Sequence, residues 1–476
     1  MSFNPRSIEQ FRITSFEVDA SGARAFLRYA LDDQYQFEER VDFGHPGLTL
    51  SPGRERGLER AVRLLHLVAG VSYYKAAAPR RIVVETGPLS GAEKLLCHDV
   101  YEKGMRDFAY RNGFALPRAL EICVADDHRS RNEAEEEVPG EASVVEAPEP
   151  GVAVPLGGGK DSIVVLEALN SPENSESRSS RRGWREWHGK RPVLVSVNPN
   201  PAVKRIASIA GLDLARMRRT IDPLLFKLND DGALNGHVPV TAIVSLLTVA
   251  GGYLHGYDTT AVALESSANA PTRVLDRSDG AVRDGVEVNH QWSKSAEFED
   301  QLQKVLRESV HESIRYLSPL RRFSELEITA AFATLTPYLS SFRSCNRASK
   351  LTRQLDGWCL DCPKCRFVFI ALALGLARRD VVAVFGADLL DDESQVEGFC
   401  DLLDPRRKPF ECVGSVEEVA EAFRRLLADP AWSGASVLER IRPIVQELPA
   451  PGAHALAQPG EVFAGIRRAL LRTGSP

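Results

Sequence analysis

Three consecutive glycines stand where the sequence changes from a strand pattern to a helix pattern. Gly157-Gly158-Gly159 follow the apolar run Val152–Leu156 and precede Lys160-Asp161-Ser162. Consecutive glycines allow backbone N–H groups to turn toward a polyanion, and the helix after them directs its positive end at the same anion. The alternative is an ordinary glycine-rich turn. Because both flanking patterns are present, the sequence favours a phosphate-binding turn.

Four clustered cysteines form a second group with a chemical pattern. Cys359, Cys362 and Cys365 make two Cys-x-x-Cys steps, and Cys345 lies a short loop upstream. Four thiolates around a zinc ion require such compact spacing. Reduced buried cysteines, or an iron–sulfur cluster with three of these ligands and a bystander, are the alternatives. We expect a structural zinc site, because a closed four-thiolate set leaves no position for a substrate.

Polar side chains at the ends of predicted strands could contact a ligand. Glu265 and Ser266 come at the expected carboxyl end of the strand Thr260–Glu265, and Ser196 lies in the expected strand Pro192–Asn198. In a doubly wound sheet the carboxyl edge faces the nucleotide. A plain polar turn is an equal alternative for Glu265 and Ser266.

Two later segments contain groups that can transfer protons. His290 and Lys294 are one helical turn apart, in a segment where Asn, Gln and Ser side chains can also hold carboxylates. A lone histidine is more often structural, but the accompanying lysine favours a functional site. His237 is a weaker candidate, because it could simply cap the helix Pro239–Leu254.

The composition restricts the class of protein. The 476 residues are 43% hydrophobic and 26% charged, which is typical of a soluble protein of two or three domains. A net charge of −6 gives no support to a nucleic-acid-binding surface. Met1–Gln10 lacks the apolar core of a signal peptide, and the longest apolar run, Phe367–Ala377, is too short to cross a bilayer.

The remaining cysteines are scattered, at Cys97, Cys123, Cys400 and Cys412. This usage indicates a reducing cytoplasm rather than a disulfide framework.

The chain divides into four parts by pattern. Residues 1–125 are predicted to form an α+β domain that starts with a three-stranded antiparallel meander, and residues 126–150 an acidic linker. Residues 151–295 alternate strands and helices, which indicates a doubly wound parallel sheet, with a surface insertion at 171–190. Residues 296–476 are expected to be mainly helical and to carry the cysteine cluster.

The expected elements can be given by residue range. The strands of the core are Val152–Leu156, Pro192–Asn198, Met217–Ile221 and Thr260–Glu265, and its helices are Ser162–Leu169, Ala202–Ala210 and Pro239–Leu254. A helix is also expected near Gly91–Arg111, and later helices at Glu299–Leu317, Glu325–Thr334, Phe367–Arg378 and Val416–Leu427.

The glycine turn resembles the pyrophosphate loop of the ATP pyrophosphatase superfamily, whose pattern is Ser-Gly-Gly-x-Asp-Ser. Gly157 takes the place of the first serine, so one hydroxyl contact is missing. Asp161 follows Lys160 where the common nucleoside-triphosphate loop has Ser or Thr, and Ser162 replaces the last glycine of the dinucleotide fingerprint. Enzymes of this superfamily split ATP between the α- and β-phosphates and attach AMP to a substrate oxygen.

Six motifs spread over most of the chain belong together. Besides the glycine loop they are His237-Val238-Pro239-Val240-Thr241, Glu265-Ser266-Ser267-Ala268-Asn269, Asn289-His290-Gln291-Trp292-Ser293-Lys294-Ser295, Trp358-Cys359-x-x-Cys362-x-x-Cys365 and Lys408-Pro409-Phe410-Glu411-Cys412-Val413-Gly414. In this combination they resemble the MurL family, the UDP-N-acetylmuramoyl-L-alanyl-L-glutamate epimerases of peptidoglycan synthesis.

This resemblance implies a function and a set of site residues. The terminal L-glutamate of the UDP-muramyl dipeptide would be inverted through a carboxyl-adenylate, with ATP and magnesium consumed and AMP and pyrophosphate released. The acid/base residue would be among His290 and Lys294, with His237 in reserve. The nucleotide would be held by Gly157, Gly158, Gly159, Lys160, Asp161, Ser162, Ser196, Glu265 and Ser266 in an adenine-nucleotide α-hydrolase-like core.

Two other functions stay open at this point. Another adenylating enzyme, similar to 7-cyano-7-deazaguanine synthase, would share the loop and the cysteines but would leave the first 125 residues unexplained. A non-catalytic ATP-binding protein is less consistent with an intact Lys160-Asp161-Ser162.

Overall fold

The computed structural model describes most of the chain. The described residues are 3–44, 50–125, 145–170, 191–345, 357–449 and 456–471, with short pieces between 347 and 354. The predicted insertion at 171–190 and most of the predicted acidic linker, 126–144, lie outside these residues.

Ten strands form one mixed sheet. In chain order they are β1 Gln10–Val18, β2 Arg24–Leu31, β3 Tyr35–Asp42, β4 Arg81–Val84, β5 Glu121–Val124, β6 Val152–Pro155, β7 Val193–Val197, β8 Leu214–Thr220, β9 Thr259–Ala261 and β12 Arg315–Leu317. Their order across the sheet is β12-β9-β6-β7-β8-β3-β2-β1-β4-β5. Two-stranded ribbons are formed by β10 Arg273–Leu275 with β11 Val286–Val288, and by β13 Ser349–Lys350 with β14 Arg353–Gln354.

The predicted antiparallel meander is confirmed, and it continues into the rest of the sheet. Strands β1, β2 and β3 pair antiparallel in sequence, as their alternation of buried and exposed residues requires. Strand β3 also pairs antiparallel with β8, with Val41 opposite Arg219. The predicted α+β region and the strand–helix region therefore share one sheet.

The expected parallel strands meet beside the glycine turn. Strand β6 lies between β7 and β9 and is parallel to both. The chain proceeds from β6 through β7 to β8 on one side and then returns to β9 on the other side. Such a reversal of strand order opens a crevice beyond the carboxyl ends of the strands, where ligands bind in open α/β sheets.

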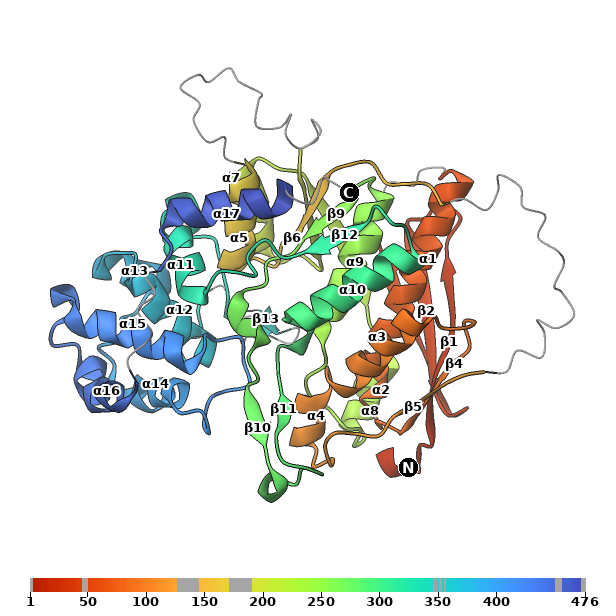
Figure 1. Cartoon of the computed structure of the whole chain (residues 1–476), viewed down its shortest axis with the longest axis horizontal. Helices are drawn as coiled ribbons and strands as arrows, with labels where there is room; N and C mark the ends of the chain where they lie inside the picture. The colour runs from red at the N-terminus through yellow and green to blue at the C-terminus, as the bar shows by residue number, and fades with distance from the viewer. Residues whose placement is uncertain are drawn as a thin grey trace, which may run out of the picture.

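Sixteen α-helices surround the sheet and extend beyond it in the described chain (Figure 1). They are α1 Pro52–Ala69, α2 Val71–Tyr74, α3 Gly91–Glu102, α4 Arg106–Arg111, α5 Lys160–Asn170, α7 Pro201–Ala210, α8 Pro223–Asp230, α9 Val240–Leu254, α10 Ala296–Ser309, α11 Glu325–Ala333, α12 Pro363–Ala373, α13 Arg378–Phe385, α14 Val396–Leu403, α15 Val416–Ala428, α16 Ser436–Glu447 and α17 Pro459–Leu471.

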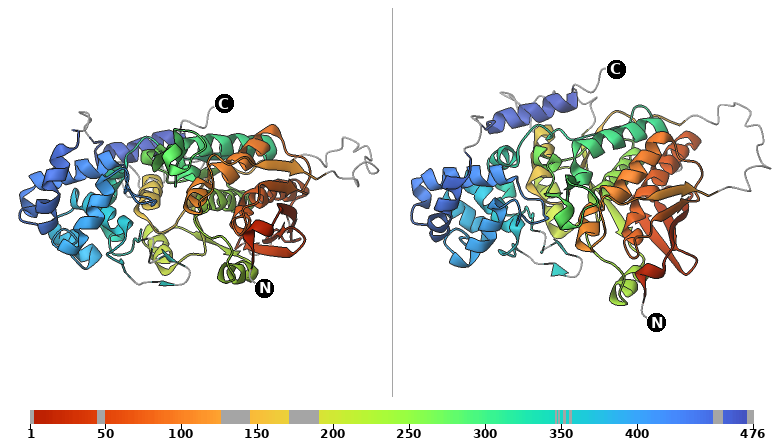
Figure 2. Two further views of the ribbon diagram at one scale, coloured as in Figure 1. Left: turned by 90° about the horizontal axis from the view of Figure 1, so that it is seen from below. Right: turned by 60° about the horizontal axis from the view of Figure 1, so that its bottom comes forward.

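Alternate residues of β6 enter two different apolar cores. Ala153 packs with the core that contains the meander, α1 and α9, whereas Val152 and Val154 pack with α5 and the C-terminal helices. The two-residue period of a strand is the cause. Helices α12–α16 gather at one end of the molecule, and α17 returns to pack on α5 and α11 (Figures 1 and 2).

Three expected helices differ from the structure. The helix expected over Phe367–Arg378 is α12, which spans Pro363–Ala373, and Arg378 begins the separate helix α13. The helix expected over Glu299–Leu317 ends at Ser309, because Arg315–Leu317 pairs parallel with β9 as an additional edge strand. The helix expected over Gly91–Arg111 is divided into α3 and α4 at residues 103–105. Over Arg315–Leu317, tertiary pairing overrides the local helix pattern. Among the described residues, no helix combines the length and apolar character that crossing a bilayer requires.

Candidate active site

The glycine turn is open on one side and supported on the other. It connects β6 to α5, and Gly158 has φ +92°, a conformation that favours glycine. A Cβ atom at Gly157 would meet nothing within 4 Å, while one at Gly159 would lie 3.3 Å from Ser344 Oγ. The Arg343 N–H donates to the Gly158 carbonyl at 2.8 Å. The segment before Cys345 thus supports the turn and leaves its outer side free for a ligand.

Lys160 is fully buried at the start of α5 and pairs with two carboxylates, Asp161 and Glu325. Burial alone would lower the pKa of its amine, but the charges of Asp161 and Glu325 outweigh burial and raise that pKa. Lys160 therefore stays cationic. Ser162 Oγ donates to the Gly159 carbonyl at 3.1 Å and helps to close the turn.

Three carboxylates gather beside the glycine turn. Oxygen atoms of Asp161, Glu265 and Glu325 all lie within 4.8 Å of one another. The strand expected over Thr260–Glu265 is β9, which ends at Ala261, so Glu265 lies four residues beyond the strand. Glu325 begins α11 after the capping residue Ser324. Oxygen ligands of this kind, completed by phosphate oxygens and water, suit magnesium. The set is therefore a candidate divalent-cation site.

The environments of Glu265 and Glu325 shift the pKa values of these two side chains in opposite directions. Burial raises the pKa of Glu265. Glu325 is also buried, but the ammonium groups of Lys160 and Lys364 outweigh burial and lower its pKa to about 2. The Lys364 Nζ atom lies 3.4 Å from Glu325 Oε1. Glu325 is therefore ionised at neutral pH and forms ion pairs with Lys160 and Lys364 beside the glycine turn.

The histidines singled out in the sequence are in contact. The ring centroids of His237 and His290 are 4.0 Å apart. His290 Nδ1 lies 2.7 Å from Asp107 Oδ2, and Arg111 donates to the other oxygen of Asp107 at 2.7 Å. Burial, followed by the charge of His290, lowers the pKa of His237 to about 3.

This histidine group could serve one of two purposes. Asp107, His237 and His290 offer ligand atoms within 4.8 Å of one another, so they could hold a metal. Alternatively, the carboxylate fixes the orientation and tautomer of His290 for acid/base chemistry, leaving Nε2 to exchange protons. The direct Asp107–His290 contact favours the second arrangement.

Lys294 interacts with the carboxylates at the glycine turn and with the histidines. Its Nζ atom lies 3.2 Å from Cys412 Sγ. Desolvation would lower the pKa of the Lys294 amine, but Cys412 and Glu265 outweigh it and raise that pKa. The charge of Lys294 also acts on Asp161 and on His237. Lys294 is therefore close enough to interact electrostatically with carboxylates of the first group and with a histidine of the second.

The four clustered cysteines converge as the sequence predicts. Their sulfur atoms all lie within 4.8 Å of one another, with separations of 3.5 Å for Cys362–Cys365, 3.7 Å for Cys359–Cys365 and 3.9 Å for Cys345–Cys362. Four sulfurs at about 2.3 Å from a tetrahedral zinc would be about 3.8 Å apart. The cluster is therefore a candidate metal site, with Cys362 also capping α12.

Ser196 and Ser266, the two other predicted nucleotide contacts, lie in or after the parallel strands on either side of β6, which leads into the glycine turn. Ser196 is buried near the carboxyl end of β7, next to β6. Ser266 begins a short 3₁₀ helix, and its N–H donates to the Phe323 carbonyl at 3.0 Å.

Several residues of the site were not singled out from the sequence. Asp107 falls inside an expected helix, Glu325 has the pattern of an N-terminal helix residue, and Cys412 is one of the scattered cysteines. The only sequence signal for Cys412 was its place in the Lys408–Gly414 motif. The partners of these residues come from distant parts of the chain, so local pattern could not assign them.

Comparison with known proteins gives matches over nearly the whole chain. A family model described as the MurL N-terminal domain matches residues 2–319, and one described as the MurL C-terminal domain matches residues 341–456. The chain is 40% identical over 448 residues to a relative from Micromonospora sp., covering 93% of this chain and 92% of the relative. It is 40% identical over 446 residues to one from Salinispora tropica, covering 93% and 90%. It is 34% identical over 451 residues to one from Xanthomonas oryzae pv. oryzae, covering 94% and 92%. All three relatives are named UDP-N-acetyl-alpha-D-muramoyl-L-alanyl-L-glutamate epimerase.

Proposed function

The chain belongs to the MurL family, and from that membership we propose that it inverts the terminal L-glutamate of UDP-N-acetylmuramoyl-L-alanyl-L-glutamate to the D form. The product would enter peptidoglycan precursor synthesis. The observation that carries the proposal on the structural side is that Lys294, whose Nζ atom contacts Cys412 Sγ at 3.2 Å, interacts electrostatically both with Glu265 and Asp161 and with His237. One site can then activate a carboxylate and move a proton beside it.

Activation solves a chemical problem. Removing the α-proton of glutamate next to a free carboxylate would place a carbanion beside an existing negative charge. If the carboxylate oxygen attacks the α-phosphorus of ATP and pyrophosphate leaves, the resulting acyl-adenylate has no carboxylate charge, and its carbonyl can accept the electron pair. Hydrolysis after reprotonation would release AMP and the D-glutamyl product.

The glycine turn and its neighbours are suited to the phosphates. The open face at Gly157 allows backbone N–H groups to approach a diphosphate, and Lys160 and Lys364 supply positive charge beside it. Asp161, Glu265 and Glu325 would hold magnesium, which neutralises phosphate charge when bound. A core of the ATP pyrophosphatase type is part of this proposal.

Two different groups are available for proton transfer. His290, oriented by Asp107, is proposed to exchange a proton with the α-carbon through Nε2. Cys412, in contact with Lys294, is proposed to act as the second acid/base group, with the lysine ammonium as its counter-charge. Lys294 itself stays protonated, since its amine pKa is raised. Inversion requires removal and return of the proton on opposite faces, and two separate groups satisfy that requirement.

The four-cysteine site is proposed to hold structural zinc. The metal would fix the segment from Arg343 to Cys345, which supports the glycine turn through the Arg343–Gly158 hydrogen bond. Cys362 caps α12, and Lys364 lies in the first turn of that helix. The metal would therefore also fix the position of Lys364 against Glu325. No substrate contact is assigned to the metal.

The direct test is chiral analysis of glutamate after the purified protein is incubated with the UDP-muramyl dipeptide, ATP and magnesium. We expect D-glutamate, with AMP and pyrophosphate formed in parallel. His290→Ala should form no D-glutamate. Arg440→Ala, on the outer surface of α16, is the matched control and should retain wild-type turnover. ADP and phosphate as products, or unchanged L-glutamate with wild-type protein, would contradict the proposal.

A further inference from the structure

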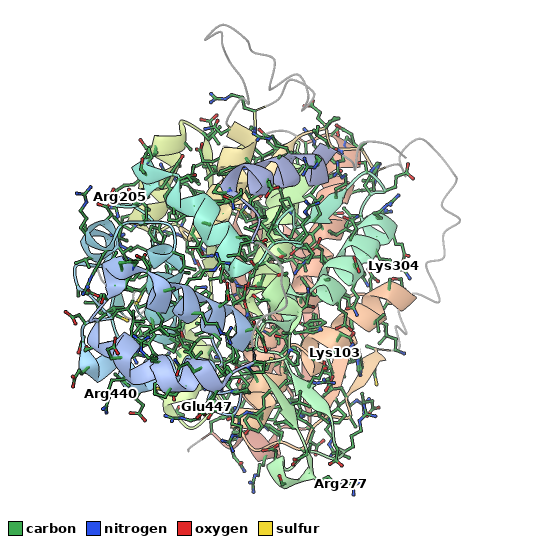
Figure 3. The ribbon with its side chains drawn as sticks, turned by 60° about the vertical axis from the view of Figure 1, so that its left-hand side comes forward. Lys103, Arg205, Arg277, Lys304, Arg440 and Glu447 are labelled. Carbon is green, nitrogen blue, oxygen red and sulfur yellow. The ribbon has the colours of Figure 1, made fainter. Side chains whose placement is uncertain are left out.

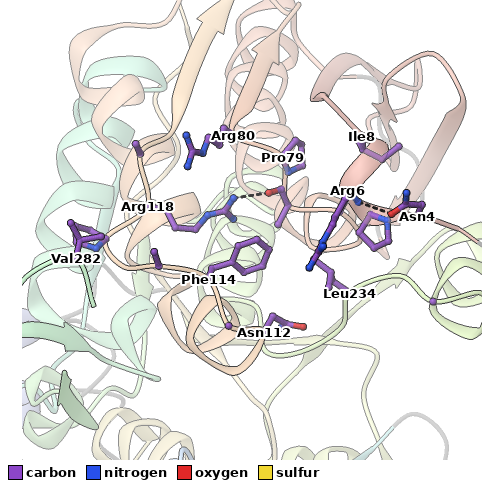
Figure 4. Close-up of a pocket in the computed structure, with 18 residues that line it drawn as sticks. Asn4, Arg6, Ile8, Pro79, Arg80, Asn112, Phe114, Arg118, Leu234 and Val282 are labelled. Atoms are coloured by element: carbon purple, nitrogen blue, oxygen red, sulfur yellow. Dashed lines mark hydrogen bonds between the residues drawn. The ribbon is translucent and has the colours of Figure 1, made fainter. Parts of the chain in front are cut away.

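An open pocket lies apart from the carboxylates and the cysteine cluster, near the N-terminal end of the described chain (Figure 4). Its volume is about 900 Å³, large enough for a nucleotide-sized ligand. Its walls come from the first described residues, the turn before β4, the segment after α4 and the segment after α8.

The pocket is positively charged. Arg6, Arg80 and Arg118 line it, and none of the 18 lining residues is acidic. Arg118 donates to the Ala78 carbonyl at 2.7 Å and to Tyr74 Oη at 3.2 Å, and its guanidinium lies 4.3 Å from the centre of the Phe114 ring. These partners are neutral, so they fix the side chain without cancelling its charge. Within the described chain, Arg6, Arg80 and Arg118 form no ion pair.

Two segments that line the pocket continue along the chain to the His237–His290 pair. Asn112 follows α4, whose Asp107 contacts His290, and Leu234 precedes His237 by three residues. Asn112 Nδ2 donates to the Asn235 carbonyl at 3.4 Å and ties these walls together. Five helical steps from Asp107 to Asn112 span roughly 8 Å.

We infer that this pocket binds the nucleoside diphosphate end of the substrate, with its arginines on the phosphates; the inference rests on the proposed function. Guanidinium groups match phosphate oxygens through paired hydrogen bonds. The muramoyl sugar with its lactoyl group and one alanine residue separate the diphosphate from the reacting α-carbon, a distance on the order of 10–15 Å. The roughly 8 Å from Asp107 to Asn112, with the pocket beyond Asn112 and His290 beyond Asp107, is consistent with that length. ATP would occupy the glycine turn at the same time.

The test uses the double variant Arg6→Ala/Arg80→Ala in the full chain, because both side chains are exposed and can be removed without disturbing the core. We expect calorimetric titration with UDP to show binding at least tenfold weaker than in the wild type. The KM for the UDP-muramyl dipeptide should rise by a similar factor, with the KM for ATP unchanged. Arg440→Ala, at an exposed position of α16 that does not line the pocket (Figure 3), is the matched control and should bind UDP normally.

Other outcomes separate this inference from the proposed function. Equal UDP affinity in the double variant and the wild type, binding of uridine as tight as that of UDP, or competition between ATP and UDP would each overturn the pocket assignment. Failure of the proposed function would instead appear as wild-type protein that binds UDP through these arginines but forms no D-glutamate.

Discussion

Replacement of Cys412 by alanine tests whether two groups act on opposite faces of the α-carbon. The change removes a half-buried thiol whose sulfur lies 3.2 Å from Lys294 Nζ. Glu265 stays as a counter-charge for Lys294, so we expect the fold to be retained. Loss of one acid/base group typically costs 10²–10⁴-fold in rate, which corresponds to about 3–5 kcal/mol in the barrier. Epimerisation should fall by that factor.

The assay follows α-proton exchange in deuterated water, starting separately from the L and the D epimer. In Cys412→Ala, His290 can still remove and return a proton on its own face, so exchange should persist from one epimer only. His290→Ala should give the mirror result, with exchange from the other epimer only. AMP formation should continue in Cys412→Ala, because the residues proposed to bind the phosphates are unchanged. Cys123→Ala, on β5, is the control and should behave as the wild type.

Two results would refute this reasoning. If Cys412→Ala epimerises at the wild-type rate, the thiol takes no part in proton transfer. If both variants retain exchange from the same epimer, the two groups do not act on opposite faces of the α-carbon.

Three further changes have expected outcomes. Asp107→Asn should lower kcat by about 10²–10³-fold with little change in KM, because His290 loses the carboxylate that fixes its tautomer; steady-state kinetics would show it, and an unchanged kcat would exclude that role. Cys365→Ser should lose bound zinc by elemental analysis and raise the KM for ATP about tenfold, since the support of Gly158 would loosen; zinc loss with an unchanged KM would disprove the coupling. Burial lowers the pKa of His66 from 6.5 to about 4, so the unfolded protein binds more protons than the folded protein between these pH values. The free energy of unfolding is therefore higher by about 3 kcal/mol above pH 6.5, and this contribution is lost as the pH falls to 4. Urea unfolding of His66→Gln at several pH values should therefore show a free energy of unfolding that falls less between pH 6.5 and 4 than in the wild type. The same fall in both proteins would contradict this assignment.

Features of this protein that depend on local pattern can be predicted from the order of its residues alone. Strand alternation predicted the meander, the glycine run marked the turn between β6 and α5, and the two Cys-x-x-Cys steps predicted the sulfur cluster. Each is a property of a short segment, because the period of an element or the reach of a loop is set by neighbouring residues. The division into separate parts and the roles of Ser196 and Ser266 stay predictions.

Which distant groups meet is set by the folded chain and cannot be predicted from any one segment. The pairing of β3 with β8, the strand at Arg315–Leu317, and the contacts of Asp107 with His290 and of Lys294 with Cys412 join residues far apart in the chain. Local propensity contains no information about such partners. They are fixed when the sheet order and the packing of the C-terminal helices bring separate segments to one edge, and the balance of charge and desolvation there sets the chemistry of the site.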